Sequence, residues 1–367
     1  MIAADLPPSS SVQRAKRSPQ MAPMRRPAAV EPVKGESWLI LADAGPLARA
    51  LLHEAAALGV EASLASPGLA FAQLGPAHYS VSLADAQSSA ALLRALPRMP
   101  RRVVHALCVT AATASASLDE TALDRVYFSL LHLGQALSEL DLEEPLQLLI
   151  ATQRAYDVAG TLTEQPLHAL AQGPALVMPR ELPEVHTRLL DLADTSDAEA
   201  VARELLAELC SPGAERVVAR RAGARYVQVI ARCELPPPAA SLPEQPVFLF
   251  TGGLGEIARS LAAHFAQLSG ARIALLARTA LPARRVWPEL ARGGADAQSK
   301  LLGELLALEA RGVALTILRA DVANAPQLKA AVAHAREQLG RIDVVIHAAG
   351  TIDDAPLAHK TRAAARR

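Results

Sequence analysis

The sequence predicts an α/β protein with two parallel-sheet subdomains, of which the second is incomplete. Apolar stretches of strand length alternate with segments of helical periodicity, an order typical of parallel sheets with crossover helices. Hydrophobic residues make up 51% of the 367 residues but aromatic residues only 3%, which favours helix-covered sheets over an all-β sandwich. A proline-rich stretch divides the chain, which is long enough for two cores.

Residues 1–36 are predicted to be a disordered segment or a linker. They are rich in Pro, Ser and Arg and lack the apolar centre of a signal peptide. No apolar run in the chain approaches the roughly 18 residues of a membrane span, so no membrane partner is expected. Lys and Arg together number 37, as do Asp and Glu, so no net field attracts nucleic acid.

The three cysteines, Cys108, Cys210 and Cys233, are far apart and show no paired Cys or His spacing. Neither a disulfide framework nor a metal site is therefore expected. Because disulfides belong to oxidising compartments, the cysteine usage favours a cytoplasmic protein.

Residues 37–235 are predicted to form the first subdomain. Its expected elements are strands at 37–43, 59–64, 102–109, 146–152 and 188–192, helices at 47–58, 121–140 and 197–209, and a hairpin of 216–220 with 224–229. This order is that of a Rossmann-type half with right-handed crossovers. The hairpin is predicted to turn at Arg221-Ala222-Gly223.

The first subdomain contains no recognisable catalytic group. Its first turn holds only Gly45, followed by a proline, which disfavours close approach to a pyrophosphate. Tyr156 is followed four residues later by Gly160 and not by the lysine of a reductase pair, so it is interpreted as a loop residue. His105 and His132 lie within apolar elements and are interpreted as core or helix-face residues.

Residues 236–246 are predicted to be a linker. Five prolines fall between Glu234 and Pro246. Proline removes backbone donors and resists both helix and central strand, so this stretch indicates a boundary or a semi-rigid connection.

The second subdomain, residues 247–367, begins with the most informative stretch of the chain. The apolar run Val247–Phe250 stops at Thr251-Gly252-Gly253-Leu254-Gly255, and a helix is predicted over 257–268. Glycines allow a tight turn and close backbone approach, and a helix N-terminus offers unpaired N–H groups and a positive dipole end. A strand, a glycine turn and a helix in succession therefore predict a pyrophosphate site.

The end of the next predicted strand, 272–277, indicates which dinucleotide is bound. An NAD site places an acidic residue there to accept from the ribose 2′-hydroxyl, but no Asp or Glu occurs between Ala271 and Leu281. Arg278 stands at that place, followed by Thr279. A guanidinium suits a 2′-phosphate by charge and by its forked donors, so NADP(H) is predicted.

Two further strands complete the predicted sheet. After an insertion at 282–312 that includes a helix over 298–310, a strand at 313–320 ends at Asp321-Val322. A helix is expected over 327–339, and a strand at 342–350 ends in the small residues Ala348, Ala349 and Gly350. These small residues leave room for a cofactor above the sheet edge.

The motifs of the second half together resemble a known family. TGGLGEIA, LLART, ADVAN and GRIDVVIHAAGTIDD are similar to the ketoreductase domain of modular type I polyketide synthases, within the short-chain dehydrogenase/reductase superfamily. The first half resembles the cofactor-free, degenerate Rossmann-like structural subdomain of that family, so the resemblance covers roughly residues 37–367.

The resemblance implies a role in NADP(H) binding for a set of residues at the strand ends. The cofactor turn would comprise Thr251, Gly252, Gly253, Leu254, Gly255 and Ile257, the 2′-phosphate would be held by Arg278 and Thr279, the adenine would contact Asp321 and Val322, and the ribose side would be lined by Ala348, Ala349 and Gly350.

The chain departs from the family pattern within the glycine turn. Glu256 replaces a small uncharged residue and would repel a pyrophosphate, while Ala258 replaces the last glycine. We therefore expect weakened, not abolished, cofactor binding. Ile352-Asp353-Asp354 resembles the Leu-Asp-Asp marker of reductases that give a D-configured β-hydroxyl, with a different first residue.

No catalytic residue is assigned. The resemblance implies a Tyr, Ser, Lys and Asn beyond the strand that ends at Gly350, yet all tyrosines precede the glycine turn and Lys360 lies before the family's catalytic lysine. The chain is expected to be a fragment, inactive alone, of an enzyme that reduces a β-ketoacyl thioester with NADPH. Its partners would be the rest of a polyketide synthase module, including an acyl carrier protein. A split enzyme or scaffold completed by a second chain, and an NADPH-binding regulator, are the alternatives.

Overall fold

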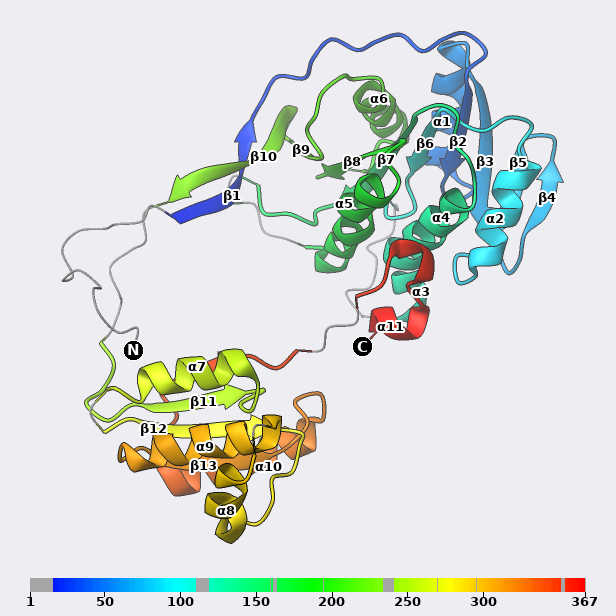
Figure 1. Cartoon of the computed structure of the whole chain (residues 1–367). Helices are drawn as coiled ribbons and strands as arrows, with labels where there is room; N and C mark the ends of the chain where they lie inside the picture. Colours follow the sequence, from blue (N-terminus) through cyan, green and yellow to red (C-terminus); the bar gives the residue numbers. More distant parts are fainter. Residues whose placement is uncertain are drawn as a thin grey trace. The chain divides into compact units, whose positions relative to one another are not determined.

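The computed structural model describes residues 16–109, 119–158, 160, 164–193, 195–233, 241–268, 270–294, 296–350 and 354–366. The chain divides into two compact units, the first being Met1–Leu235 with Asp354–Arg367 and the second Pro236–Asp353. Each unit is a β-sheet with helices packed on its faces (Figure 1).

The first unit is built on a ten-stranded sheet. In chain order its elements are β1 (Lys16–Pro23), β2 (Ser37–Leu41), α1 (Pro46–Ala57), β3 (Glu61–Pro67), β4 (Ala72–Gly75), β5 (His78–Val81), α2 (Ala86–Ala95), β6 (Arg102–His105), α3 (Glu120–Leu123), a π-helical turn (Asp124–Phe128), α4 (Ser129–Ser138), β7 (Leu146–Gln153), a 3₁₀ segment (Pro166–Ala171), α5 (Gln172–Glu181), β8 (Val185–Leu192), α6 (Ala198–Leu209), β9 (Val217–Arg221), β10 (Ala224–Cys233), a second 3₁₀ segment (Leu357–His359) and α11 (Arg362–Arg366).

The strand order of this sheet is that of a doubly wound fold with antiparallel edges. The order is β1-β10-β9-β8-β7-β6-β2-β3-β5-β4. Strands from β9 to β5 in this order pair in parallel, whereas β10 with β9, β1 with β10, and β4 with β5 pair antiparallel. The order reverses between β2 and β6, as expected for a Rossmann-like half.

Alternation along the buried strands divides the apolar residues between two cores. In β2, Leu39 and Leu41 face the core formed with α2, α4 and α5, whereas Trp38 and Ile40 face the core formed with α1 and α6. Helices on both faces explain why the parallel strands are almost continuously apolar. Hydrophobic burial on both sides therefore holds the first unit together.

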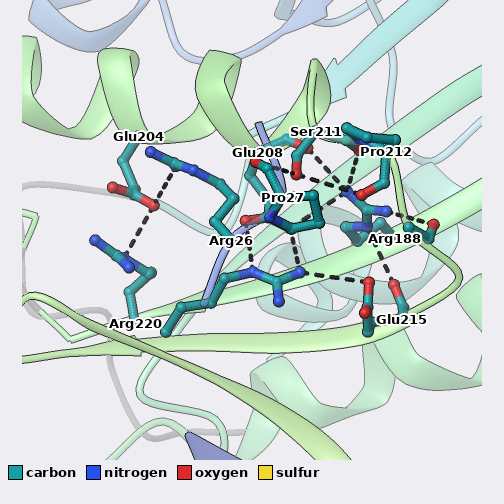
Figure 2. A network of polar contacts seen from close by, with 11 residues as sticks. Arg26, Pro27, Arg188, Glu204, Glu208, Ser211, Pro212, Glu215 and Arg220 are labelled. Atoms are coloured by element: carbon teal, nitrogen blue, oxygen red, sulfur yellow. Dashed lines mark hydrogen bonds and ion pairs between the residues drawn. The ribbon is translucent and has the colours of Figure 1, made fainter. Parts of the chain in front are cut away.

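A network of arginines and glutamates joins α6 to the N-terminal segment, to β9 and to β10 (Figure 2). Arg26 and Arg220 both pair with Glu204, at 3.0 and 2.9 Å. Arg225 and Glu208 are buried and share two hydrogen bonds, from Nε at 3.0 Å and from Nη2 at 2.9 Å. Such a paired, bidentate arrangement is the form in which buried charge is tolerated.

Two expected boundaries differ from the structure. Residues 1–36 were expected to be disordered or a linker, but Lys16–Pro23 form β1, which pairs with β10 along its length. The expected second subdomain, 247–367, also differs, because Asp354–Arg367 group with the first unit. Both differences arise from contacts between segments far apart in sequence, which local composition does not reveal.

The second unit is a four-stranded parallel sheet with the order β13-β12-β11-β14. Its elements are β11 (Val247–Thr251), α7 (Glu256–Phe265), β12 (Arg272–Ala277), a 3₁₀ segment (Arg284–Val286), α8 (Trp287–Arg292), α9 (Ala297–Ala310), β13 (Ala314–Arg319), α10 (Ala325–Leu339) and β14 (Val344–His347).

Helices cover both faces of the second sheet. On one face Phe248 and Phe250 of β11 pack with Ala258 of α7 and with α9, and Phe248 stacks on Phe265 with ring centroids 4.6 Å apart. On the other face Leu249 and its neighbours pack against α10. The predicted α/β class with two Rossmann-like parallel sheets is thus confirmed.

Most predicted elements are present, with one notable interruption. The helix expected over 121–140 is broken by the π-helical turn Asp124–Phe128 between α3 and α4. The predicted hairpin is formed by β9 and β10. Among the described residues, no helix combines the length and the apolar character needed to cross a membrane.

Candidate functional site

The predicted site residues of the second unit gather at one edge of its sheet. Thr251 ends β11 and is in register with Leu276 of β12 and with His347 of β14, and Ala277 of β12 is in register with Arg319 of β13. The C-terminal ends of parallel strands meet at a common edge, which is where open α/β sheets bind their ligands.

The glycine turn after β11 is required by close backbone packing. Gly252 has a φ of 62°, and a Cβ there would lie 2.6 Å from the carbonyl oxygen of Ala348. A Cβ on Gly253 would lie 2.7 Å from Cα of Leu275, and the Gly253 N–H donates to the Leu276 carbonyl at 2.8 Å. The turn therefore sits directly against the ends of β12 and β14, and only glycine fits at these two positions.

Helix α7 begins at this turn without a side-chain cap. Gly255 is its N-cap and contributes no side-chain hydrogen bond, in contrast to Asp197 of α6, Asp296 of α9 and Asn324 of α10. The first N–H groups of a helix lack intrahelical partners and carry the positive end of its dipole. The start of α7 can therefore receive an anion.

Four side chains near the turn are arranged in different ways. Glu256 and Ile257 are exposed in the first turn of α7, and 72% of Ile257 is accessible. Leu254 packs partly against the core, and Ala258 is fully buried in it. Ala258 thus fills helix–sheet space, whereas Glu256 places a carboxylate beside the anion-receiving end of α7.

The ends of β12 and β13 place predicted polar contacts at the same edge. Arg278 and Thr279 directly follow β12 and are exposed, and within the described part of the chain Arg278 enters no ion pair. After β13, one carboxylate oxygen of Asp321 accepts from the Ala323 N–H at 2.9 Å. Its neighbour Val322 packs against the core beneath α10.

The end of β14 is tied to the start of the glycine turn. The hydroxyl of Thr251 lies 2.6 Å from Nδ1 of His347, and the Ala348 N–H donates to the Thr251 carbonyl at 3.1 Å. Ala349 follows with a 3.4 Å bond to the same hydroxyl. No atom of the described residues lies within 4 Å of a Cβ built on Gly350, so the described part of the chain leaves this end of the site open.

His347 was not predicted as a site residue. Its neighbours Ala348, Ala349 and Gly350 were chosen because they are small, and a histidine ending an apolar strand next to them was the only sequence signal. Its imidazole is exposed and lies beside a groove. This groove, of about 900 Å³, is lined largely by apolar side chains of β11, α10 and β14 together with Thr251, Val322 and His347.

Comparison with family models shows which known domains the sequence resembles. Residues 246–367 match the family described as the KR domain. Residues 246–367 therefore fit the ketoreductase domain of a modular polyketide synthase. Residues 38–208 also match a family described as beta-ketoacyl synthase-like, N-terminal. That match falls within the first unit.

Two curated relatives of the chain are a polyketide synthase and an erythronolide synthase. The chain is 32% identical over 247 residues to a phenolphthiocerol/phthiocerol polyketide synthase of Mycobacterium tuberculosis, covering 65% of the chain and 13% of the relative. It is 30% identical over 277 residues to erythronolide synthase EryA3 of Saccharopolyspora erythraea, covering 76% of the chain and 8% of the relative. The chain thus spans a small part of these much longer proteins.

Solved structures show the same fold. The first ketoreductase of the tylosin polyketide synthase aligns with a TM-score of 0.66 at 22% identity, covering 95% of the chain and 66% of that structure. An A1-type ketoreductase aligns with a TM-score of 0.61 at 25% identity, covering 95% of the chain and 67% of that structure.

The corresponding edge of the first unit is organised differently. Next to the C-terminal ends of β2 and β6, where the strand order reverses, Arg125 pairs with Asp43 and donates to the Leu107 carbonyl at 3.2 Å. His105 is fully buried, with Nε2 2.8 Å from the Ser129 hydroxyl, and burial lowers its pKa to about 3. Burial likewise raises the pKa of Tyr156. The imidazole of His105 and the phenol of Tyr156 are therefore neutral, as is usual for titratable groups shielded from solvent.

Proposed function

We propose that the second unit binds NADP(H) at the C-terminal edge of its sheet. In this proposal the chain is the cofactor-binding part of a β-ketoreductase that, in complete form, reduces a β-ketoacyl thioester on an acyl carrier protein to the β-hydroxyacyl product. The match of residues 246–367 to the KR domain supports the reaction class. The rest of a polyketide synthase module would supply the partner domains, and the cytoplasm is the proposed location.

The observation that carries the proposal is the pairing of two anion-receiving groups on adjacent strands. The uncapped N-terminus of α7 follows β11, and the exposed guanidinium of Arg278 follows β12. A dinucleotide with a 2′-phosphate carries anions at two such places, on its pyrophosphate and on its adenosine ribose. NAD(H) lacks the second anion and would leave Arg278 without that contact.

Each strand end has a distinct task in this proposal. The N–H groups at the start of α7 hold the pyrophosphate, and the forked donors of Arg278, with Thr279, hold the 2′-phosphate. Asp321 keeps one carboxylate oxygen on the Ala323 N–H and offers the other to the adenine amino group. Ala348 and Ala349 leave space for the ribose side, and NADPH, when bound, supplies the hydride.

The second unit offers no tyrosine as a proton donor. Tyr79, Tyr127, Tyr156 and Tyr226 all precede residue 247. Hydride transfer to a ketone needs an acid that neutralises the developing alkoxide. We therefore propose that the chain binds NADPH but does not reduce a ketone by itself. The measurement is NADPH consumption with a β-keto thioester model substrate, and steady turnover by the purified chain would contradict this part of the proposal.

Replacing Arg278 tests the cofactor. Arg278→Ala should weaken NADPH binding about 10–100-fold, because a charge-assisted contact contributes roughly 1.5–3 kcal/mol, and should leave NADH binding nearly unchanged. Titration of nicotinamide fluorescence measures both affinities. Arg311→Ala is the matched control, because Arg311 is exposed and precedes β13, so it lies at the opposite edge of the sheet. Equal NADPH affinities for the two variants would overturn the assignment.

A second candidate is a scaffold or split enzyme that a second chain completes. The observation in its favour is β14, an edge strand of the four-stranded sheet with 61% of Val345 exposed beside the apolar groove. Exposed apolar edge strands pair with other chains. We expect the chain to associate in light scattering and Val345→Lys to reduce that association. A monodisperse monomer at high concentration would count against this candidate.

A further inference from the structure

The last described segment of the chain, residues 354–366, is called here the C-terminal strap. It follows the second unit in sequence but is grouped with the first. Its 3₁₀ segment Leu357–His359 lies against α4 and α5. The contacts of the strap with the first unit fall into three kinds: a buried leucine, captured backbone groups and paired arginines.

Leu357 is seated in a socket of the first unit. Only 4% of the side chain is exposed, and it belongs to the core formed by α2, α4 and α5. The socket exists because residue 134 is glycine: a Cβ there would lie 2.8 Å from Cδ2 of Leu357. Met178 of α5 borders the same space, with its methyl carbon 3.3 Å from that Cβ position.

The backbone around Leu357 is held by side chains of the first unit. The Leu357 N–H donates to the Glu181 carboxylate at 2.6 Å. The Gln135 amide donates to the carbonyls of Leu357 and Lys360, at 3.1 and 2.9 Å. Because these hydrogen bonds go to backbone groups, the first unit contacts the segment through its backbone conformation as well as through its apolar side chain.

Arginines fix the far end of the strap. Arg362 pairs with Glu120 at 2.7 Å and with Asp124, and its guanidinium carbon lies 4.0 Å from the ring centroid of Phe128. Arg366 also pairs with Glu120. Guanidinium groups pair with carboxylates and stack on aromatic rings, so α3 and the adjacent π-helical turn present a surface suited to arginine.

The strap has little structure of its own. Its helical pieces are the three-residue segment Leu357–His359 and the five-residue α11, and it belongs to no sheet. Helices this short are not stable alone in water. The order of the strap therefore comes from its contacts with the first unit.

We propose that the first unit is a peptide-docking module whose ligand is the strap, a segment with a leucine and an arginine five residues apart. Docking is reversible, and its release leaves the sheet of each unit folded. This assigns a binding function to the first unit, which is separate from cofactor binding by the second.

Substitution of Gly134 tests the proposal through trypsin sensitivity. Gly134→Ala fills the space that Leu357 occupies. In the full chain it should raise the rate of cleavage after Lys360 and Arg362 tenfold or more, because proteolysis tracks the fraction of molecules in which the strap is released. Gly173→Ala is the matched control, since a Cβ there meets its nearest neighbour at an ordinary 3.8 Å. This control should be cut at the wild-type rate.

Two further variants keep the test independent of folding defects. Leu357→Asp changes the strap itself and should show the same rapid cleavage with an unchanged circular dichroism spectrum. Arg362→Glu should also release the strap, and combining it with Glu120→Arg should restore part of the protection.

Binding in trans completes the test. A labelled synthetic peptide of residues 354–366 should bind the Leu357→Asp chain in fluorescence anisotropy, whereas the same peptide carrying the Leu357→Asp change should not. Wild-type cleavage rates in Gly134→Ala and Leu357→Asp, or absence of peptide binding, would overturn the proposal. NADPH affinity is not a readout here, so this outcome is separable from that of the proposed function.

Discussion

At the scale of single residues, Glu256 opposes the site in which it lies. Its carboxylate is exposed in the first turn of α7, beside the N-terminus proposed to receive the pyrophosphate. An acid in this position stabilises the helix but repels an anionic ligand. Glu256 therefore stabilises α7 but lowers the affinity of this site for an anionic ligand.

Neutralising Glu256 should tighten cofactor binding. We expect Glu256→Gln to lower the NADPH dissociation constant about 2–5-fold, because exposed charges at a helix end contribute roughly 0.3–1 kcal/mol. Fluorescence titration at low salt measures the change, and added salt should diminish it. Glu337→Gln removes the same charge near the C-terminal end of α10, at the opposite edge of the sheet, and should have no effect. An equal gain in both variants would refute a local role for Glu256.

Single residues also show what the sequence could not reveal about the site. Arg278 was found because its place after a strand and the absence of nearby acids are local features. His347 was missed because its bond to Thr251 joins residues 96 positions apart, and only the pairing of β11 with β14 brings them together. The glycine pattern was interpreted as a ligand-binding turn. The structure shows a second reason for glycine at residue 252, because the neighbouring backbone approaches too closely for a Cβ. Sequence alone does not distinguish these two reasons.

At the scale of elements, the β9–β10 hairpin contains a correctable strain. Its turn residues Ala222 and Gly223 have φ values of 46° and 79°, the left-handed pair of a type I′ turn. Alanine rarely adopts this conformation, whereas asparagine does so readily. We expect Ala222→Asn to stabilise the protein by about 0.5–1 kcal/mol and Ala222→Val to destabilise it. Urea unfolding measures both, and a stabilising valine would contradict the assignment of strain.

Elements with a strong local pattern were predictable, and elements that depend on partners were not. The apolar runs that form β2, β7, β11 and β12 were recognised because both faces of these strands are covered. The strand β1 contains two prolines and has no alternating pattern, so its pairing with β10 was missed. The π-helical turn at Asp124–Phe128 interrupts a helix whose periodicity alone predicts continuity.

At the scale of the whole molecule, the first unit is predicted to be sensitive to acid. Burial lowers the pKa of His105 to about 3, and it also lowers the pKa of His132 and of His168. In the unfolded chain these groups take up a proton near pH 6.5. The unfolded state therefore binds more protons below that pH, and acid favours unfolding.

The pH dependence has a defined window and size. For His105 the contribution to stability is complete above pH 6.5 and is lost as the pH falls toward 3, at about 1.4 kcal/mol per pH unit. Trp38 lies in the first unit and Trp287 in the second, so tryptophan fluorescence of a Trp287→Phe chain follows the first unit alone. Denaturant unfolding between pH 7 and 4 then gives the slope. His105→Gln should make this slope shallower, and an unchanged slope would exclude His105 as its source.

The largest differences from expectation also lie at this scale. The α/β class and the two sheets followed from local alternation of strands and helices, but the assignment of residues 354–366 to the first unit did not. Leu357 joins a core whose other buried members end in sequence at Leu189. No periodicity or composition links a lone leucine to a glycine on a helix more than 200 residues earlier.

The seat of Leu357 has a consequence for synthesis on the ribosome. The second unit places 118 residues, Pro236–Asp353, between the last strand of the first unit and the strap. At roughly 5–20 residues per second, the nascent first unit waits roughly 6–24 s for its final core side chain. Throughout that interval the apolar seat between α4 and α5 faces solvent at the exit of the ribosome. The order of translation thus exposes, for that interval, an apolar surface of the kind that chaperones bind.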